Sequence, residues 1–182
     1  MKRRILTMIV AVVAMASMAA CSPTRTTRSG GETLDDATVT AKVKTALARD
    51  PSTSAYRIEV ETFRGEVQLN GFVETSDMKS SATRVAKSVG GVQKVSNNLK
   101  VSTGERTAGE VVDDGVITAK VKAALVSDPN VAAHEVNVQT REGVVQLAGF
   151  VDTGDQKAKA SEVTRRIAGV KQVDNQLEVK TR

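Results

Sequence analysis

An internal repeat is the feature that most constrains how this chain can fold. The segment Gly65–Val73 returns 78 residues later as Gly143–Val151. When that register is extended without a gap, Asp35–Val101 lies over Asp113–Val179, and 32 of the 67 aligned positions are identical. Length alone would favour one domain for 182 residues, but a repeat of this kind indicates one small module used twice.

The pattern within one copy predicts five elements. After Asp35-Asp36, apolar residues recur at helical spacing as far as Asp50-Pro51, which predicts an amphipathic helix that opens at the acidic pair. Two runs of alternating apolar and polar residues then meet at Arg64-Gly65, as in a β-hairpin. A second helix, capped near Thr75, and a last strand, Val95–Val101, complete the module. The second copy repeats each signal.

The element order α-β-β-α-β predicts an α+β fold. We expect two tandem modules, each a three-stranded sheet with both helices on one face, so that the opposite face of the sheet is open. The expected boundaries are a signal peptide at 1–20, a lipidated flexible tether at 21–33, the first module at 34–102, a linker at 103–111 and the second module at 112–180.

The N-terminus has the pattern of an export signal. Lys2-Arg3-Arg4 precedes the apolar run Ile5–Ala16, which is too short for a comfortable membrane span. Cys21, the single cysteine, directly follows Met18-Ala19-Ala20, and this resembles a bacterial lipobox whose thiol takes a diacylglycerol. We therefore expect a periplasmic lipoprotein, anchored to the outer membrane because Ser22 rather than Asp follows the cysteine. The alternative is cleavage after Ala16 and a soluble periplasmic protein.

Charge and composition exclude several function classes. The formal charge is +5, and it falls to +2 when Lys2, Arg3 and Arg4 are removed with the signal. The remaining basic residues are scattered, so no nucleic-acid partner is predicted. His134 is the single histidine, and no metal-ligand spacing or nucleotide-binding motif is present. The acidic pairs are interpreted as helix caps, so we expect no enzyme, no cofactor and no metal.

The repeated pattern resembles a known family. Gly-x-Val-x-Leu-x-Gly-x-Val, followed by a helix and by Gly91–Val101, is similar to the BON domain (bacterial OsmY and nodulation). The second copy matches through Gly143–Val151 and Gly169–Val179, so the resemblance covers nearly all of the mature chain. It implies a non-enzymatic envelope protein associated with anionic phospholipid binding, outer-membrane integrity, osmotic stress and outer-membrane protein assembly.

The resemblance also implies where a partner binds. In lipid-binding relatives the opening helix of the second module meets the membrane, aided there by an aromatic side chain, and Val116 occupies the matching place here. The expected lipid- or partner-binding residues are Val116, Lys120, Lys122 and Ala123. The alternative is a chaperone-like protein whose exposed sheet faces and edges hold unfolded or outer-membrane proteins.

Four further residues are identical between the copies although alternation places them on the open face of the sheet. They are Gln68, Phe72, Gln146 and Phe150. Two interpretations stay open. Either a bulge at the neighbouring glycine turns both rings into the core, or these side chains mark a surface where the modules or a partner dock.

Overall fold

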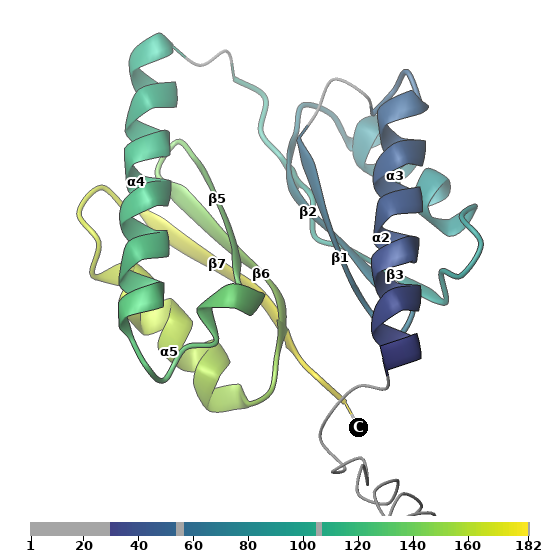
Figure 1. Ribbon diagram of the computed structural model, residues 1–182. Coiled ribbons are helices and arrows are strands. Elements are labelled where there is room, and N and C mark those ends of the chain that lie inside the picture. The colour runs from purple at the N-terminus through teal and green to yellow at the C-terminus, as the bar shows by residue number, and fades with distance from the viewer. Residues whose placement is uncertain (1–29, 54–56, 105–106, 182) are drawn as a thin grey trace, which may run out of the picture. The chain divides into compact units, whose positions relative to one another are not determined.

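The computed structural model describes residues 30–53, 57–104 and 107–181, and it folds them into two modules with the same element order (Figure 1). The predicted signal peptide and Cys21 lie outside the described residues. The first module consists of α2 (Gly30–Arg49), β1 (Ile58–Phe63), β2 (Glu66–Val73), α3 (Ser76–Lys87), β3 (Lys94–Asn97) and β4 (Lys100–Val101). The second consists of α4 (Ala108–Ser127), the short 3-10 helix η1 (Ala133–Glu135), β5 (Asn137–Arg141), β6 (Val144–Val151), α5 (Gly154–Arg165) and β7 (Gln172–Val179).

Each sheet is mixed and has the longest hairpin strand at its centre. In the first module β2 pairs antiparallel with β1 and parallel with β3 and β4, which are two pieces of one strand line. In the second module β6 pairs in the same way with β5 and with the uninterrupted β7. Both helices of each module cover one face of its sheet (Figure 1). The predicted α+β fold of two three-stranded modules is confirmed.

Each module has its own apolar core between the helices and the sheet. The alternating valines and leucines of the central strand point into it, as predicted. In the first module the core includes Val43, Leu47, Val60, Val67, Leu69, Val73, Ala82 and Leu99. In the second it includes Val121, Leu125, Val138, Val145, Leu147, Val151, Ala160 and Leu177. Aliphatic side chains therefore supply nearly all of the burial that holds each small module together.

The first helix of each module starts earlier than predicted. α4 begins at Ala108, within the predicted linker and well before Asp113. Thr107 caps it, because its Oγ1 accepts from Glu110 N at 3.2 Å while Glu110 Oε2 accepts from Thr107 N at 2.8 Å. This reciprocal pair is a capping box, and it satisfies two backbone donors that a helix start leaves free. The prediction that the acidic pair opens the helix is wrong.

The second aspartate of each pair instead ties the helix to the hairpin turn. Asp36 accepts from the backbone N–H groups of Arg64 and Gly65, at 2.8 and 3.0 Å. Asp114 makes the same two bonds to the equivalent turn of the second module, at 2.8 and 3.0 Å. Both turn residues have positive φ, 50° at Arg64 and 74° at Gly65. A tight turn of this type aims adjacent amides at one acceptor, and a buried carboxylate uses both.

Candidate functional site

The outer face of α4 carries an apolar stripe that the fold leaves uncovered. Successive helical residues turn by about 100°, so positions spaced alternately by four and three share one face. Five exposed residues have this spacing: Val112, Val116, Ala119, Ala123 and Val126. The three valines are 63%, 45% and 74% exposed. The opposite face packs Ile117, Val121 and Leu125 into the core, so α4 is apolar on two sides.

Two lysines flank the stripe. On a helical wheel Lys120 and Lys122 lie roughly 80° to either side of Val112. Both are exposed. The structure therefore brings Val116, Lys120, Lys122 and Ala123 together on the solvent side of one helix. Sequence reasoning did not name Val112 and Val126, although the four-three spacing of small and apolar residues from 112 to 126 was the signal that marks them.

The equivalent helix of the first module differs in its apolar content and keeps its lysines. The residues of α2 that correspond to Val112, Val116, Ala119, Ala123 and Val126 are Leu34, Thr38, Ala41, Thr45 and Ala48. The lysine positions are retained as Lys42 and Lys44, of which Lys44 pairs with Glu59 at 3.6 Å. Among the side chains that the structure describes, large exposed apolar ones occur on α4 and at two strand ends, and none lies on α2 from Asp35 to Arg49. The two helices therefore offer different surfaces on one scaffold.

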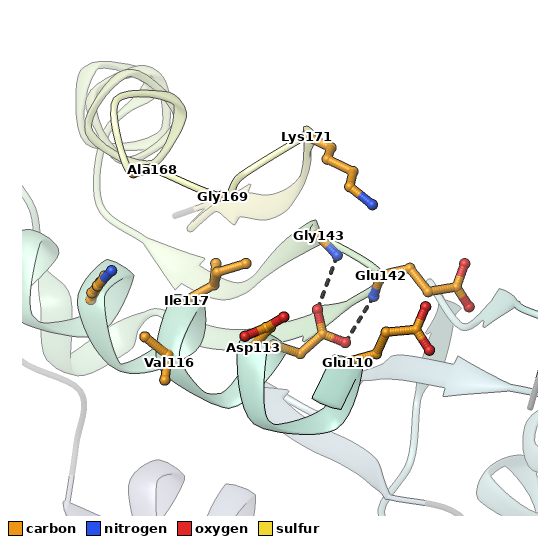
Figure 2. A pocket seen from close by; sticks show the side chains of 11 residues that line it. Glu110, Asp113, Val116, Ile117, Glu142, Gly143, Ala168, Gly169 and Lys171 are labelled. Carbon is orange, nitrogen blue, oxygen red and sulfur yellow. Dashed lines mark hydrogen bonds between the residues drawn. The ribbon is translucent and has the colours of Figure 1, made fainter. Parts of the chain in front are cut away.

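A pocket of about 360 Å³ opens beside the N-terminal half of α4. It lies between this helix, the hairpin turn at Glu142-Gly143 and the turn at Ala168-Gly169 that follows α5. Ile117 points towards Gly169, whereas Val116 points away from it (Figure 2). Glu110, Asp113 and Lys171 stand at the rim, and the Asp114 carboxylate is occupied by the two turn amides (Figure 2).

The first module has the same pocket at equivalent positions. Its ten lining residues are Asp35, Asp36, Thr38, Val39, Lys42, Arg64, Gly65, Gly90, Gly91 and Gln93, and each corresponds to a lining residue of the second pocket 78 positions later. Three exchanges change its chemistry: Thr38 for Val116, Arg64 for Glu142 and Gln93 for Lys171. The recurrence shows that the hollow belongs to the fold, and that the residues around it distinguish the two modules.

Gln68 and Gln146 lie between the two sheets, where each bonds to the other module. Gln146 Oε1 accepts from Gly71 N at 2.6 Å, and Gln68 Oε1 accepts from Gly149 N at 3.1 Å. These are the same hydrogen bond made twice, because 68 and 71 correspond to 146 and 149 in the repeat. Both glutamines are at most 1% exposed. The face expected to be open is thus covered by the other module.

The glycines that recur in the two copies permit this contact. Gly71 and Gly149 have φ values of 122° and 128°, which side-chain-bearing residues rarely adopt. A Cβ on Gly71 would lie 2.8 Å from the carbonyl oxygen of Arg57, and one on Gly149 would lie 2.0 Å from that of Glu135. At each glycine the strand therefore lies close to the backbone of the chain segment that precedes the hairpin. The N–H of the glycine donates to the glutamine of the other module.

The two phenylalanines that recur in the repeat, Phe72 and Phe150, are placed differently. Phe150 is buried and packs on Phe63 of β1 with ring centroids 5.4 Å apart, so this ring contact also joins the modules. Phe72 is half-buried. The position of the second module that corresponds to Phe63 is Arg141, whose guanidinium donates to the carbonyls of Ser102 and Gly104 at 3.0 and 2.9 Å. The repeat is thus broken where the connecting segment crosses.

Charged and polar groups complete the contact between the modules. Asn137 Nδ2 donates to Glu61 Oε1 at 2.5 Å, and Lys100 Nζ lies 3.3 Å from Asp174 Oδ2. Burial raises the pKa of Glu61, against the opposing effects of Lys44 and of the Asn137 hydrogen bond. Burial acts the same way on Glu66 and is the largest single influence there, but the hydrogen bonds from Lys94 and Ser96 and the charge of Lys94 together outweigh it and hold the pKa of Glu66 below its ordinary value.

Within the described ranges no helix is long and apolar enough to cross a membrane. The same part of the chain contains no group of three or more histidine, cysteine or acidic side chains placed to hold a metal ion.

Comparison with known proteins gives consistent matches over both modules. The model of the family described as BON domain matches residues 35–103 and 113–181. Osmotically-inducible protein Y of Escherichia coli is 38% identical over 151 residues, which is 82% of this chain and 75% of that protein. The outer membrane lipoprotein DolP of Haemophilus influenzae is 36% identical over 147 residues, 80% of this chain and 75% of the relative.

Solved structures give a weaker likeness. The C-terminal domain of CdsD, a structural protein of the type III secretion system of Chlamydia trachomatis, is 15% identical with a TM-score of 0.33. The match covers 80% of this chain and 67% of that domain.

Proposed function

Because the chain belongs to the BON-domain family, a non-enzymatic family, we propose that it is a cell-envelope protein that binds anionic phospholipid through the outer face of α4. The observation that carries the proposal is the uncovered stripe of valines and alanines flanked by Lys120 and Lys122. A helix that lies in a membrane interface buries an apolar face among the acyl chains while lysines reach the headgroups.

The energetics favour binding that depends on several contributions together. Each lysine near an anionic surface contributes about 1 kcal/mol. Valine inserts less strongly at an interface than an aromatic side chain, so the stripe by itself gives weak binding. An N-terminal lipid on Cys21 would supply the remaining attachment and leave α4 to orient the module on the bilayer. We propose this anchor and an outer-membrane location, and support comes from the relative named as an outer membrane lipoprotein.

The anchor has a direct test. The intact mass of the mature protein extracted from membranes should exceed the polypeptide mass from Cys21 by that of the attached acyl groups. A mass that matches unmodified polypeptide would remove the anchor from the proposal and leave the α4 surface to be tested by itself.

The lipid surface is tested by vesicle co-sedimentation of the whole chain. We expect binding to vesicles that contain phosphatidylglycerol and not to vesicles of phosphatidylcholine alone. Val116→Asp should abolish binding, because it places a negative charge in the stripe between the two lysines. Thr38→Asp, the same change at the equivalent position of α2, is the matched control and should bind as the unaltered chain does. Equal loss in both variants, or full binding by Val116→Asp, would contradict the proposal.

The chaperone-like alternative loses part of its basis. It uses exposed sheet faces, but Gln68, Gln146 and Phe150 of those faces are covered by the other module. Strand edges remain for such a role. Among the described residues, α4 carries more exposed large apolar side chains than the strand ends do.

A further inference from the structure

The two modules are nearly identical in fold, yet the residues at their contact are not the same on both sides. This difference determines which modules can pair. We infer that the sheet face of each module accepts the unlike module and rejects a second copy of itself. A second copy of this chain can therefore join the first only by exchanging modules, so that unlike modules still meet.

The repeat allows the alternative pairings to be compared. Position 71 donates to position 146 and position 149 donates to position 68, so the contact is unchanged when the two modules trade places. Two copies of one module could make the same pair of glutamine–glycine bonds. These two bonds therefore favour every pairing equally, and the choice of partner must come from the other groups around them.

In a pair of second modules, a lysine would be replaced by a carboxylate. Lys100 lies 3.3 Å from Asp174 in the observed contact. The residue of the second module that corresponds to Lys100 is Glu178. A pair of second modules would place Glu178 against Asp174 of the other copy, and would do so twice. Asp174 has little exposure to solvent, at 12% of its side chain, so the repulsion is weakly screened.

In a pair of first modules, a hydrogen-bond donor would be replaced by a carboxylate. Asn137 Nδ2 donates to Glu61 Oε1 at 2.5 Å in the observed contact. The residue of the first module that corresponds to Asn137 is Glu59. A pair of first modules would place Glu59 against Glu61 of the other copy, again twice. At these positions each like pairing opposes two acids, twice over, where the unlike pairing has a donor or a cation. The unlike pairing brings together one pair of acids of its own, Glu66 and Glu178.

The test uses the whole chain with a protease site inserted between Gly104 and Thr107. After cleavage, native mass spectrometry counts the pairs that form when two differently tagged preparations are mixed. We expect unlike pairs, including those made of pieces from different preparations, and we expect like pairs to be at least about tenfold rarer. Like pairs in comparable amounts, or pieces that separate without pairing, would overturn the inference.

A charge exchange gives a second readout. Glu178→Lys restores a lysine opposite Asp174 in a pair of second modules, so such pairs should appear after cleavage of this variant. Lys87→Asp, an exposed change on α3, is the matched control and should leave the distribution of pairs unchanged. Failure of Glu178→Lys to produce pairs of second modules would show that these charges do not select the partner.

The uncleaved chain provides an independent measurement, which does not require the pieces to survive separation. Lys100→Asp reproduces the acid–acid contact of a like pair within one chain. Amide hydrogen exchange at Gly71 and Gly149 should become about tenfold faster or more. Gln146 Nε2 donates to Asp174 Oδ2 at 3.2 Å. Asp174→Asn added to Lys100→Asp removes one acid, keeps an acceptor for Gln146 and should restore slow exchange. Unchanged exchange in Lys100→Asp, or no restoration in the double variant, would count against the inference.

Discussion

Asp114 shows how much one buried side chain contributes to a module. Its two carboxylate oxygens accept from two consecutive turn amides, and it is 4% exposed. Asp114→Asn keeps one acceptor but turns an N–H donor towards a backbone N–H, so we expect a loss of about 1–3 kcal/mol in the free energy of unfolding. Urea denaturation measures it. Asp113→Asn, at the exposed neighbour, should change the value by less than about 0.5 kcal/mol. Equal losses of stability in the two variants would show that the hydrogen bonds of Asp114 to the hairpin turn do not stabilise the module.

Glu61 links the contact between the modules to pH. Burial raises its pKa above the ordinary value of 4.5, so the folded protein holds this proton more tightly than the unfolded chain does. Its contribution to stability is therefore fully present below about pH 4.5 and is lost as the pH rises through the folded pKa. Glu61→Gln keeps an acceptor for Asn137 and removes this loss.

We expect Glu61→Gln to be more stable than the unaltered chain at pH 7 and nearly equal to it at pH 4. Denaturation of both proteins at the two pH values gives the difference in their free energies of unfolding. The titration of Glu66 and of every other group is common to both proteins and cancels in that difference. A variant that is destabilised by the same amount at both pH values would show that Glu61 is not penalised by burial.

Single residues were predicted unevenly from the sequence. Alternation identified Val67, Leu69 and Val73 as core because a strand has two faces and one was clearly apolar. The acidic pairs were misassigned, because Asp near a helix start commonly caps it. Here the carboxylate of Asp114 meets a turn 28 residues away instead. A sequence pattern does not report a contact across that separation.

The start of α4 is marked in the sequence by a capping box. Gly104 and Gly109 made the segment resemble a linker, but Thr107-x-x-Glu110 is the spacing of a capping box. The same extra turn brings Val111 and Val112 onto a helix, and so lengthens the exposed stripe. Local pattern was sufficient to predict the strands and helices, and the helix ends depended on capping side chains.

Removal of the cap should loosen this turn. Thr107→Ala deletes the acceptor for Glu110 N, and we expect a loss of about 0.5–2 kcal/mol with faster amide exchange at Val111 and Val112. Ser127→Ala, at the other end of the helix, removes a hydroxyl that bonds to the Ala123 carbonyl and should leave Val111 unaffected. If exchange at Val111 is unchanged in Thr107→Ala, the capping box does not hold the first turn.

At the scale of the whole molecule, the repeat predicted two modules but not how they meet. Alternation placed Gln68 and Gln146 on the open face, and their identity between the copies, like that of Phe72 and Phe150, was the sign that this face is used. What covers it depends on the bend at Gly71 and on side chains from both copies, such as Phe63 and Phe150. Because these faces are covered, the main difference between the exposed surfaces of the two modules is the apolar stripe, which α4 carries and the described part of α2 does not.

That asymmetry is the central claim, and an NMR titration of the whole chain with phosphatidylglycerol micelles tests it most directly. We expect amide shifts that are concentrated on residues 112–126 and include Lys120 and Lys122, with α2 from Thr38 to Ala48 unmoved. Micelles of a neutral phosphocholine detergent should produce no such pattern. Shifts of equal size on α2 and α4, or an unchanged spectrum with the anionic micelles, would contradict the account.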